Sequence, residues 1–248
     1  MSLSALVATE VDLKAHPTAL KLIEHCIPFL ASLSDQYVWS PTNVSIFPVV
    51  ILHRTPGPEL EAFLNRYYSP DTPFYITLHK LVLEGLKEKW IAAVEVNGDR
   101  YRRSRLCGPC EATHYFSITA VWMDSGYRHE TPPSSGKGKL KDISEKTELS
   151  GQFHIHPYGE INAVITFDDT AEMRGIHSWQ GAGWTSPGPG TRHYPTVRGG
   201  RVLALFFLPA GRIAYPSTAP PRGPGGLVDA PTSDLEALVI PPESVRLN

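Results

Sequence analysis

Cysteine is scarce and long apolar segments are missing from this sequence of 248 residues. The three cysteines, Cys26, Cys107 and Cys110, are too few and odd in number for a disulfide scaffold, and this usage is typical of a reducing compartment. The longest apolar runs, residues 46–52 and 202–208, fall well short of the ~20 residues that a membrane helix needs. The first residues also lack the basic and apolar regions of a secretory signal. We therefore expect a cytoplasmic protein that does not span a membrane.

An excess of charge of one sign is also missing. The chain has 23 Lys and Arg against 25 Asp and Glu, and charged residues make up 19% of it. Because no basic field exists, nucleic-acid binding is not expected. Proline (23) and glycine (20) are abundant, which favours many turns and short strands over a helical bundle.

Hydrophobic periodicity divides the chain near residue 90. Residues 12–34, 57–68 and 72–90 show helical spacing, with Asp71 as a candidate N-cap, whereas residues 37–53 look extended. Beyond residue 90, short apolar stretches alternate with Gly, Pro and Ser, as in an antiparallel sandwich or barrel. The expected strands are 92–96, 115–123, 152–156, 162–167, 183–186, 193–197 and 202–208.

We therefore predict three parts. Residues 1–90 form a helical segment that packs on a β-barrel of residues 91–215, and residues 216–248 form a proline-rich tail. Within the barrel, the lysine-rich stretch 126–150 is predicted to be a mobile surface loop, with a lid or a partner contact as the alternative.

Cys107-Gly-Pro-Cys110 has the spacing of a redox dithiol. Such a pair needs the N-terminus of a helix to lower a thiol pKa. Here the following stretch, 114–121, has the composition of a strand, so we interpret the motif as a turn.

The segment Gly151-Gln-Phe-His-Ile-His-Pro-Tyr-Gly-Glu160 concentrates residues that bind metals. Side chains alternate between the two faces of a strand, so His154 and His156 point the same way. A Pro-Tyr-Gly turn then leads to Glu160 at the start of the next strand. Two imidazoles and a carboxylate would together form a three-ligand face for a divalent metal.

His193 is the candidate fourth ligand. It follows a Gly-Pro-Gly turn, 33 residues after Glu160, and two successive hairpins of a barrel could return it to the same rim. The alternative is that these histidines lie at the surface or are satisfied core residues, as a His-x-His pair more often is. The metal would be Fe, Zn, Mn, Ni or Co, because imidazole and carboxylate suit each of them.

Two family resemblances rest on these residues. His154-x-His156-x3-Glu160 and Gly190-x-x-His193 resemble the two cupin motifs. That resemblance implies a mainly β fold, a double-stranded β-helix barrel preceded here by N-terminal helices, with the three histidines and the glutamate as metal ligands.

A narrower resemblance covers about residues 58–215 and is to the bacterial 4-hydroxylaminobenzoate lyase family. The stretches that carry it are 105–124, 154–161, 189–200 and 208–213. It implies a metal-dependent lyase of aromatic compound metabolism that converts 4-hydroxylaminobenzoate to protocatechuate and releases ammonia.

A small aromatic acid as substrate requires a cation and an apolar wall. Arg105, in the strand entering the barrel, and Arg192, beside His193, are candidates for binding the carboxylate. Trp184, like Trp179, could wall the ring, although barrel packing explains both residues equally well.

Proton transfer has three candidates, Glu160, His114 and Tyr158, and for the last two a packing role is the alternative. Two other functions stay open: an iron-dependent dioxygenase that uses the same ligands, and a non-enzymatic cupin that binds a metal or a small ligand. A homodimer is compatible with the sequence, which does not otherwise specify an oligomeric state.

Overall fold

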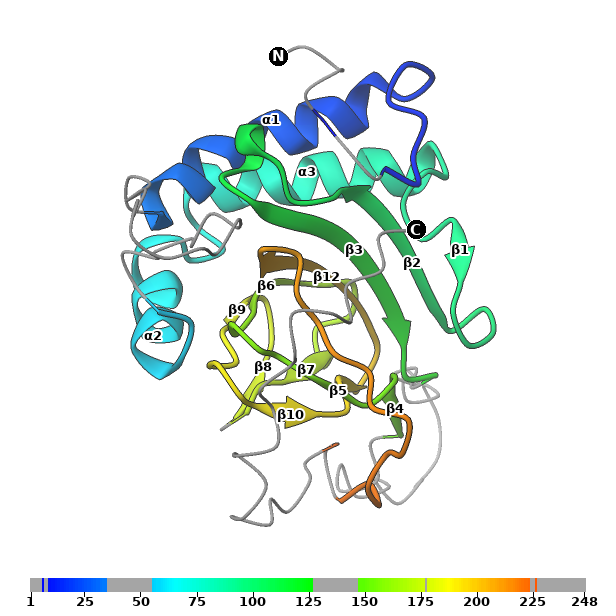
Figure 1. The fold of residues 1–248 in the computed structure, drawn as a ribbon. Coiled ribbons are helices and arrows are strands. Elements are labelled where there is room, and N and C mark those ends of the chain that lie inside the picture. The colour runs from blue at the N-terminus through cyan, green and yellow to red at the C-terminus, as the bar shows by residue number, and fades with distance from the viewer. Residues whose placement is uncertain are drawn as a thin grey trace, which may run out of the picture.

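The protein consists of a helical layer packed on β-sheets (Figure 1). The structure, a computed structural model, describes residues 6, 9–34, 55–126, 147–176, 178–223 and 226. Three α-helices come first in the chain: α1 (Pro17–Leu33), α2 (Pro58–Tyr67) and α3 (Pro73–Lys87). Twelve strands follow within the described residues, with one 3-10 turn, η2 (Glu111–Thr113), between β2 and β3.

Proline marks the start of each α-helix. All three helices have a proline in the first turn, where its missing N–H leaves no hydrogen bond unmade. In α3 the N-cap is Thr72, whose hydroxyl accepts a hydrogen bond from the backbone N–H of Tyr75. Asp71, the N-cap expected from the sequence, lies one residue too early, because Pro73 occupies the first helical position.

The largest sheet has six strands in the order β1-β2-β3-β12-β6-β9, all antiparallel. Its strands are β1 (Val94–Glu95), β2 (Tyr101–Cys107), β3 (Phe116–Asp124), β12 (Arg201–Pro209), β6 (Ile161–Thr166) and β9 (Gly183–Thr185). A four-stranded sheet contains β4 (Glu148–Ser150), β11 (Thr196–Arg198), β7 (Glu172–Arg174) and β8 (Trp179–Gln180). A two-stranded sheet pairs β10 (Arg192–His193) with β5 (His154–Ile155).

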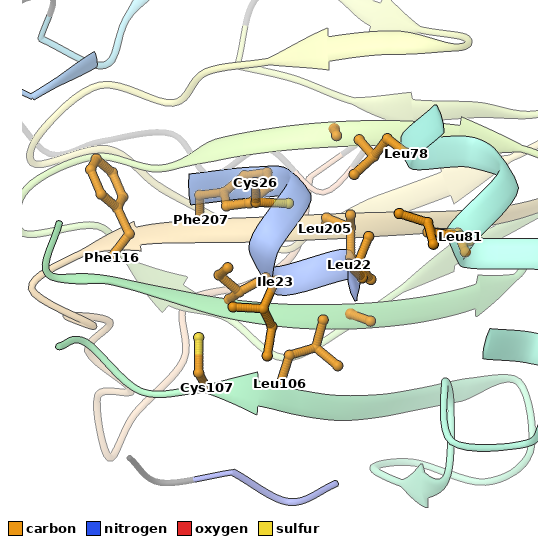
Figure 2. Close-up of a cluster of buried hydrophobic side chains, with 14 of the residues drawn as sticks. Leu22, Ile23, Cys26, Leu78, Leu81, Leu106, Cys107, Phe116, Leu205 and Phe207 are labelled. Carbon is orange, nitrogen blue, oxygen red and sulfur yellow. The ribbon is translucent and has the colours of Figure 1, made fainter. Parts of the chain in front are cut away.

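Both faces of the six-stranded sheet are buried. Along β12, Leu203, Leu205 and Phe207 point to the outer face, where α1 and α3 cover them. Figure 2 shows this outer core, in which Leu22 and Ile23 of α1 lie against the strands. The alternate residues of β12 point to the inner face and pack against the four-stranded sheet: Val202, Ala204 and Phe206.

The predicted fold class, a mainly β protein with N-terminal helices, is confirmed. Across the described residues the strands form three separate hydrogen-bonded sheets rather than one continuously closed barrel. The boundaries of most expected strands agree within a few residues. The expected strand 193–197 is instead split between β10 and β11, because Pro195 lies between them and lacks a backbone N–H.

Several segments were not predicted, and others lie outside the described residues. The strands β4, β7 and β8 span only two or three residues, too few for an alternating pattern. Most of the insertion 126–150, the expected extended stretch 37–53 and most of the tail fall outside the described part of the chain.

The three cysteines are buried and unpaired. Cys107 ends β2 and Cys110 caps the 3-10 turn, so the Cys-Gly-Pro-Cys segment is a turn, as expected. Burial, together with the nearby Cys110, raises the pKa of the Cys107 thiol to about 12, which is the opposite of what a reactive dithiol requires.

Within the described ranges, none of the helices combines the length and the apolar character required to cross a bilayer.

The aromatic contacts of the outer core predict a large stability effect at Trp184. This side chain is fully buried, packs against Phe29 at a ring-centroid distance of 5.0 Å and donates its Nε1–H to the carbonyl of Tyr68. We expect Trp184→Ala to lower the free energy of unfolding by about 3–5 kcal/mol, measured by urea denaturation. The control is Ile76→Ala on the exposed side of α3, with an expected loss below about 0.5 kcal/mol. Equal losses for the two variants would contradict this packing.

Candidate metal centre

Two short strands and two turns bring three histidines and a glutamate together. His154 lies in β5 and His193 in β10, and the two residues are direct partners in the antiparallel pairing. His156 directly follows β5, and Glu160 immediately precedes β6. One ligand atom from each of the four residues lies within 4.8 Å of all the others, and all four residues are buried.

The local backbone explains why His154 and His156 point the same way. Between them, Ile155 is held by backbone hydrogen bonds to Ala214, which keep the segment extended. Alternation then turns Phe153 and Ile155 to the opposite side, where Phe153 packs against Tyr194. The sequence-based prediction for this pair agrees with the structure.

Gly159 makes the turn to Glu160 possible. Its φ is +81°, in the left-handed region, and a Cβ atom there would lie 2.5 Å from Pro56 and 2.9 Å from the carbonyl oxygen of Pro187. The N–H of Glu160 donates to that same carbonyl, so the turn and the Pro-Gly-Pro-Gly loop are tied together.

Hydrogen bonds at Nδ1 determine which nitrogen of His154 and His156 faces the site. Nδ1 of His154 lies 3.0 Å from the carbonyl of Gln152, which can only accept, so Nδ1 carries the proton. Nδ1 of His156 lies 3.0 Å from the hydroxyl of Thr191, whose own proton is donated to the carbonyl of Gly188. His156 therefore also donates through Nδ1, and both Nε2 atoms present lone pairs to the site.

These two Nε2 atoms are only 2.9 Å apart. Two lone pairs at that distance repel each other unless a proton or a cation lies between them. A proton on His154 is disfavoured, because burial and the neighbouring His156 lower its pKa to about 4. A cation that binds both Nε2 atoms would stabilise the pair.

Other polar atoms of the group have no protein partner. Both ring nitrogens of His193 and Oε2 of Glu160 are buried without a hydrogen bond among the described residues. Unpaired buried polar atoms cost roughly 1–3 kcal/mol each in folding free energy.

The spacing of the four residues fits a metal ion. A first-row transition-metal ion with bonds of about 2.0–2.2 Å would hold its ligand atoms roughly 3–3.5 Å apart. The 2.9 Å between the two Nε2 atoms and the 3.5 Å from His156 Nε2 to Glu160 Oε1 fit that spacing.

The protonation states suit a metal. Burial alone would raise the pKa of Glu160, but His156 and His154 and a hydrogen bond from Asn162 outweigh it, so the pKa is lowered. Burial, reinforced by His154 and His156, lowers the pKa of His193 well below its usual value. An ionised carboxylate and a neutral imidazole are the forms that coordinate metals.

Hydrogen bonds through Ser186 connect the backbone of Glu160 to the helical layer. The hydroxyl of Ser186 donates to the carbonyl of Glu160 and accepts from the N–H of Gly57, just before α2. Glu61 in α2 accepts the N–H of Ser186. The position of this ligand therefore depends on α2 as well as on the sheet.

Arg105 lies on the same side of β2 as the inner core. Tyr101, Arg103 and Arg105 alternate with Ser104 and Leu106, which face the helical layer. The positive charges of Arg103 and Arg105 both act on the phenol of Tyr215. Nη2 of Arg103 lies 3.1 Å from Oε1 of Glu10 and forms an ion pair with it. Among the described residues, no carboxylate forms an ion pair with the guanidinium of Arg105.

Tyr215 and Tyr101 are neighbours of the group that the sequence reasoning missed. The ring centroids of Tyr215 and His154 are 6.0 Å apart. The negative charge of Glu160 acts electrostatically on the phenol groups of both tyrosines. Burial raises the pKa of each phenol, and Glu160 acts in the same direction. Period-two alternation along β2 could have indicated Tyr101, whereas no motif indicates Tyr215.

Arg192 and Trp184 point away from the four residues. In the β5–β10 pairing, Arg192 is opposite Ile155, on the side away from His154 and His193. Trp184 packs in the outer core against the helices, so it does not wall a site on the inner face. The inward-facing residue of that strand is its neighbour Thr185, which contacts Asn162.

His114 and Tyr158 lie outside the group of four residues. His114 follows the 3-10 turn, which packs against α1 on the outer side of the large sheet. Tyr158 sits at the tip of the turn before Glu160 with 54% of its surface exposed.

Comparison with known proteins identifies the family. The family model described as "PnbB: 4-hydroxylaminobenzoate lyase" matches residues 43–215. The chain belongs to the 4-hydroxylaminobenzoate lyase family. The match begins earlier than residue 58, where the resemblance seen in the sequence begins.

Two curated members of the 4-hydroxylaminobenzoate lyase family match nearly their whole length. The 4-hydroxylaminobenzoate lyase of Pseudomonas putida is 44% identical over 195 residues, covering 79% of this chain and 94% of the relative. That of Nocardioides sp. (strain LMS-CY) is 42% identical over 203 residues, covering 82% and 98%. A crystal structure of the DMSP lyase DddQ from Ruegeria pomeroyi DSS-3 matches with a TM-score of 0.35 and 16% identity, covering 81% of this chain and 96% of that chain.

The converging lone pairs predict that metal binding depends on His156. We expect about one divalent ion per chain in the unaltered protein and a large loss in His156→Ala, measured by elemental analysis after dialysis. His16→Ala, at the start of α1, is the matched control and should keep its metal. Far-UV circular dichroism checks that each variant is folded. Undiminished metal in a folded His156→Ala protein would remove this site.

Proposed function

We propose that this protein is a metal-dependent lyase that acts on 4-hydroxylaminobenzoate. Membership of the family supports the reaction class. The observation that carries metal dependence is the buried group of three imidazoles and one carboxylate, with lone pairs facing one another at 2.9 Å.

His154, His156, Glu160 and His193 would hold one divalent ion, Fe, Zn, Mn, Ni or Co. When bound, such an ion supplies a Lewis acid that polarises a substrate oxygen and lowers the pKa of a water molecule. The protein supplies a largely water-free surrounding, because all four ligands are buried.

The proposed reaction needs no external oxidant. Hydrolysis of 4-hydroxylaminobenzoate with one water gives protocatechuate and ammonia, and the atoms balance. The N–O bond breaks, and its oxygen leaves as water with the bonding electron pair. One water adds to the ring carbon beside the carbon that carries nitrogen, and a second water hydrolyses the resulting imine, so that two C–O bonds form, the C–N bond breaks and ammonia leaves. Two waters enter and one is released, which gives the net use of one water. The N–O bond is thus the internal oxidant, and molecular oxygen is not consumed.

Arg105 is proposed to bind the substrate carboxylate. A carboxylate that leaves water needs a cation or several donors. Arg105 lies on the inner side of β2 beside Tyr215, and Arg103 adds a second positive charge there. Glu160, a buried negative charge, would repel a carboxylate, so the acid group of the substrate is directed toward the arginines.

Tyr215 is proposed to donate a hydrogen bond to the oxygen that leaves nitrogen. Its ring lies against His154, and part of its surface remains open to a ligand. Tyr101 is more deeply buried and is held at the backbone of Gln152, so it forms part of the wall. Oε2 of Glu160, which has no hydrogen-bond partner among the described residues, is proposed to hold the proton taken from water.

The reaction is tested by anaerobic turnover. We expect the protein, loaded in turn with each candidate metal, to convert 4-hydroxylaminobenzoate to protocatechuate and one equivalent of ammonia without oxygen, followed by chromatography and an ammonia assay. His156→Ala should abolish turnover and His16→Ala should not. Product that appears only with stoichiometric oxygen uptake would indicate a dioxygenase, and no turnover with any metal would overturn the proposal.

The role of Arg105 is tested by the charge of the substrate. Loss of a charge-assisted pair costs about 2–5 kcal/mol, which is tens- to thousands-fold in kcat/KM. We expect this loss for Arg105→Ala with 4-hydroxylaminobenzoate and a much smaller loss with its uncharged amide. Arg192→Ala, whose side chain points away from the group, is the matched control. Equal losses of kcat/KM on both substrates in Arg105→Ala would show that Arg105 does not bind the carboxylate.

A further inference from the structure

We infer that Asn162 determines substrate specificity in this site: its Nδ2 fixes Glu160, and its Oδ1 accepts a hydrogen bond from an N–H group of an aryl-nitrogen substrate. The inference rests on the proposed function, because that function places an aromatic acid with a nitrogen substituent beside Glu160. It concerns a residue that no sequence motif indicates.

Both hydrogens of the Asn162 amide are used inside the protein. Nδ2 donates to Oε1 of Glu160 at 2.8 Å and to the hydroxyl of Thr185 at 3.1 Å. The opposite orientation of the amide would place its oxygen against the carboxylate of Glu160, and two acceptors would then repel each other. The carboxylate therefore determines which way the amide points.

This orientation leaves Oδ1 without a partner. Asn162 is completely buried, and its Oδ1 has no hydrogen bond among the described residues. A buried carbonyl without a donor is costly, so such atoms call for an explanation, such as a ligand or water that completes the bond. From the amide geometry, Oδ1 lies within about 5 Å of the carboxylate oxygen that receives Nδ2.

The unpaired oxygen belongs to the inner face of the sheet. Asn162 follows Glu160 by two residues on β6, and the next residue on that face, Val164, packs in the inner core. Oδ1 thus forms part of the same buried wall as the carboxylate. A hydroxylamino or amino group carries N–H donors that this acceptor can satisfy, whereas a nitro group offers only acceptors.

A site that hydrogen-bonds a substrate group rejects an analogue lacking it by large factors, because the buried protein group is then left unpaired. We therefore expect the site to prefer 4-aminobenzoate over 4-nitrobenzoate, two unreactive acids that share the ring and the carboxylate. The preference should depend on Asn162 and should not depend on Thr185, the other partner of Nδ2.

The experiment is calorimetric titration of the metal-loaded protein with each acid. In Asn162→Leu, of similar size, 4-aminobenzoate should lose about tenfold or more in affinity while 4-nitrobenzoate stays within about threefold. Thr185→Val is the matched control and should retain the preference for the amine. Metal content, measured in parallel, shows that each variant keeps a formed site.

The outcomes separate this inference from the proposed function. Equal loss of affinity for both acids in Asn162→Leu, or loss of the preference for the amine in Thr185→Val, would overturn the role of Oδ1 while leaving the aromatic-acid site in place. If the unaltered protein bound neither acid, the inference and the proposed function would both be wrong.

Discussion

Mutual repulsion among buried lone pairs is the constraint around which this molecule is built. His154 and His156 each donate their Nδ1 proton to a fixed acceptor. Their Nε2 lone pairs therefore face each other in the buried interior. Polar atoms of His193 and Glu160 that have no partner in the described part of the chain add to the cost. A fold of marginal stability can keep such a group only where the surrounding packing is strong enough to hold these side chains in place, and a bound cation would offset the repulsion.

That packing comes from a sheet buried on both faces. The outer face supplies most of the apolar burial, because α1 and α3 cover it with large side chains such as Leu22 and Leu78. The inner face can then carry polar residues at one end, where β6 meets Glu160. The Ser186 hydroxyl connects these layers through its bonds to Gly57 and Glu160. The helices are therefore part of how the ligand group is positioned as well as a cover for the sheet.

Sequence reasoning succeeded where chain distance is short. His154 and His156 share a face by alternation, and the following turn needs a glycine, so their approach to Glu160 could be predicted locally. For Trp184 the choice between a pocket wall and core packing stayed open in the sequence, because every residue of β9 is buried and the strand has no alternation between polar and apolar positions. Tyr215 lies beside His154 only because a distant bridge pairs Ala214 with Ile155, which no local pattern encodes.

The unpaired charges and acceptors of the inner face define which ligand can enter and in which direction. Near Glu160 the described residues offer acceptors, including the Asn162 oxygen that has no partner among them, and the guanidinium groups of Arg103 and Arg105 act on Tyr215. A ligand that is anionic at one end and rich in N–H and O–H donors at the other satisfies both regions. Reversing it would bring its carboxylate against Glu160 and away from Arg105, so electrostatics favours one orientation. Under the proposed function, this polarity directs the N–O bond toward the four-residue group.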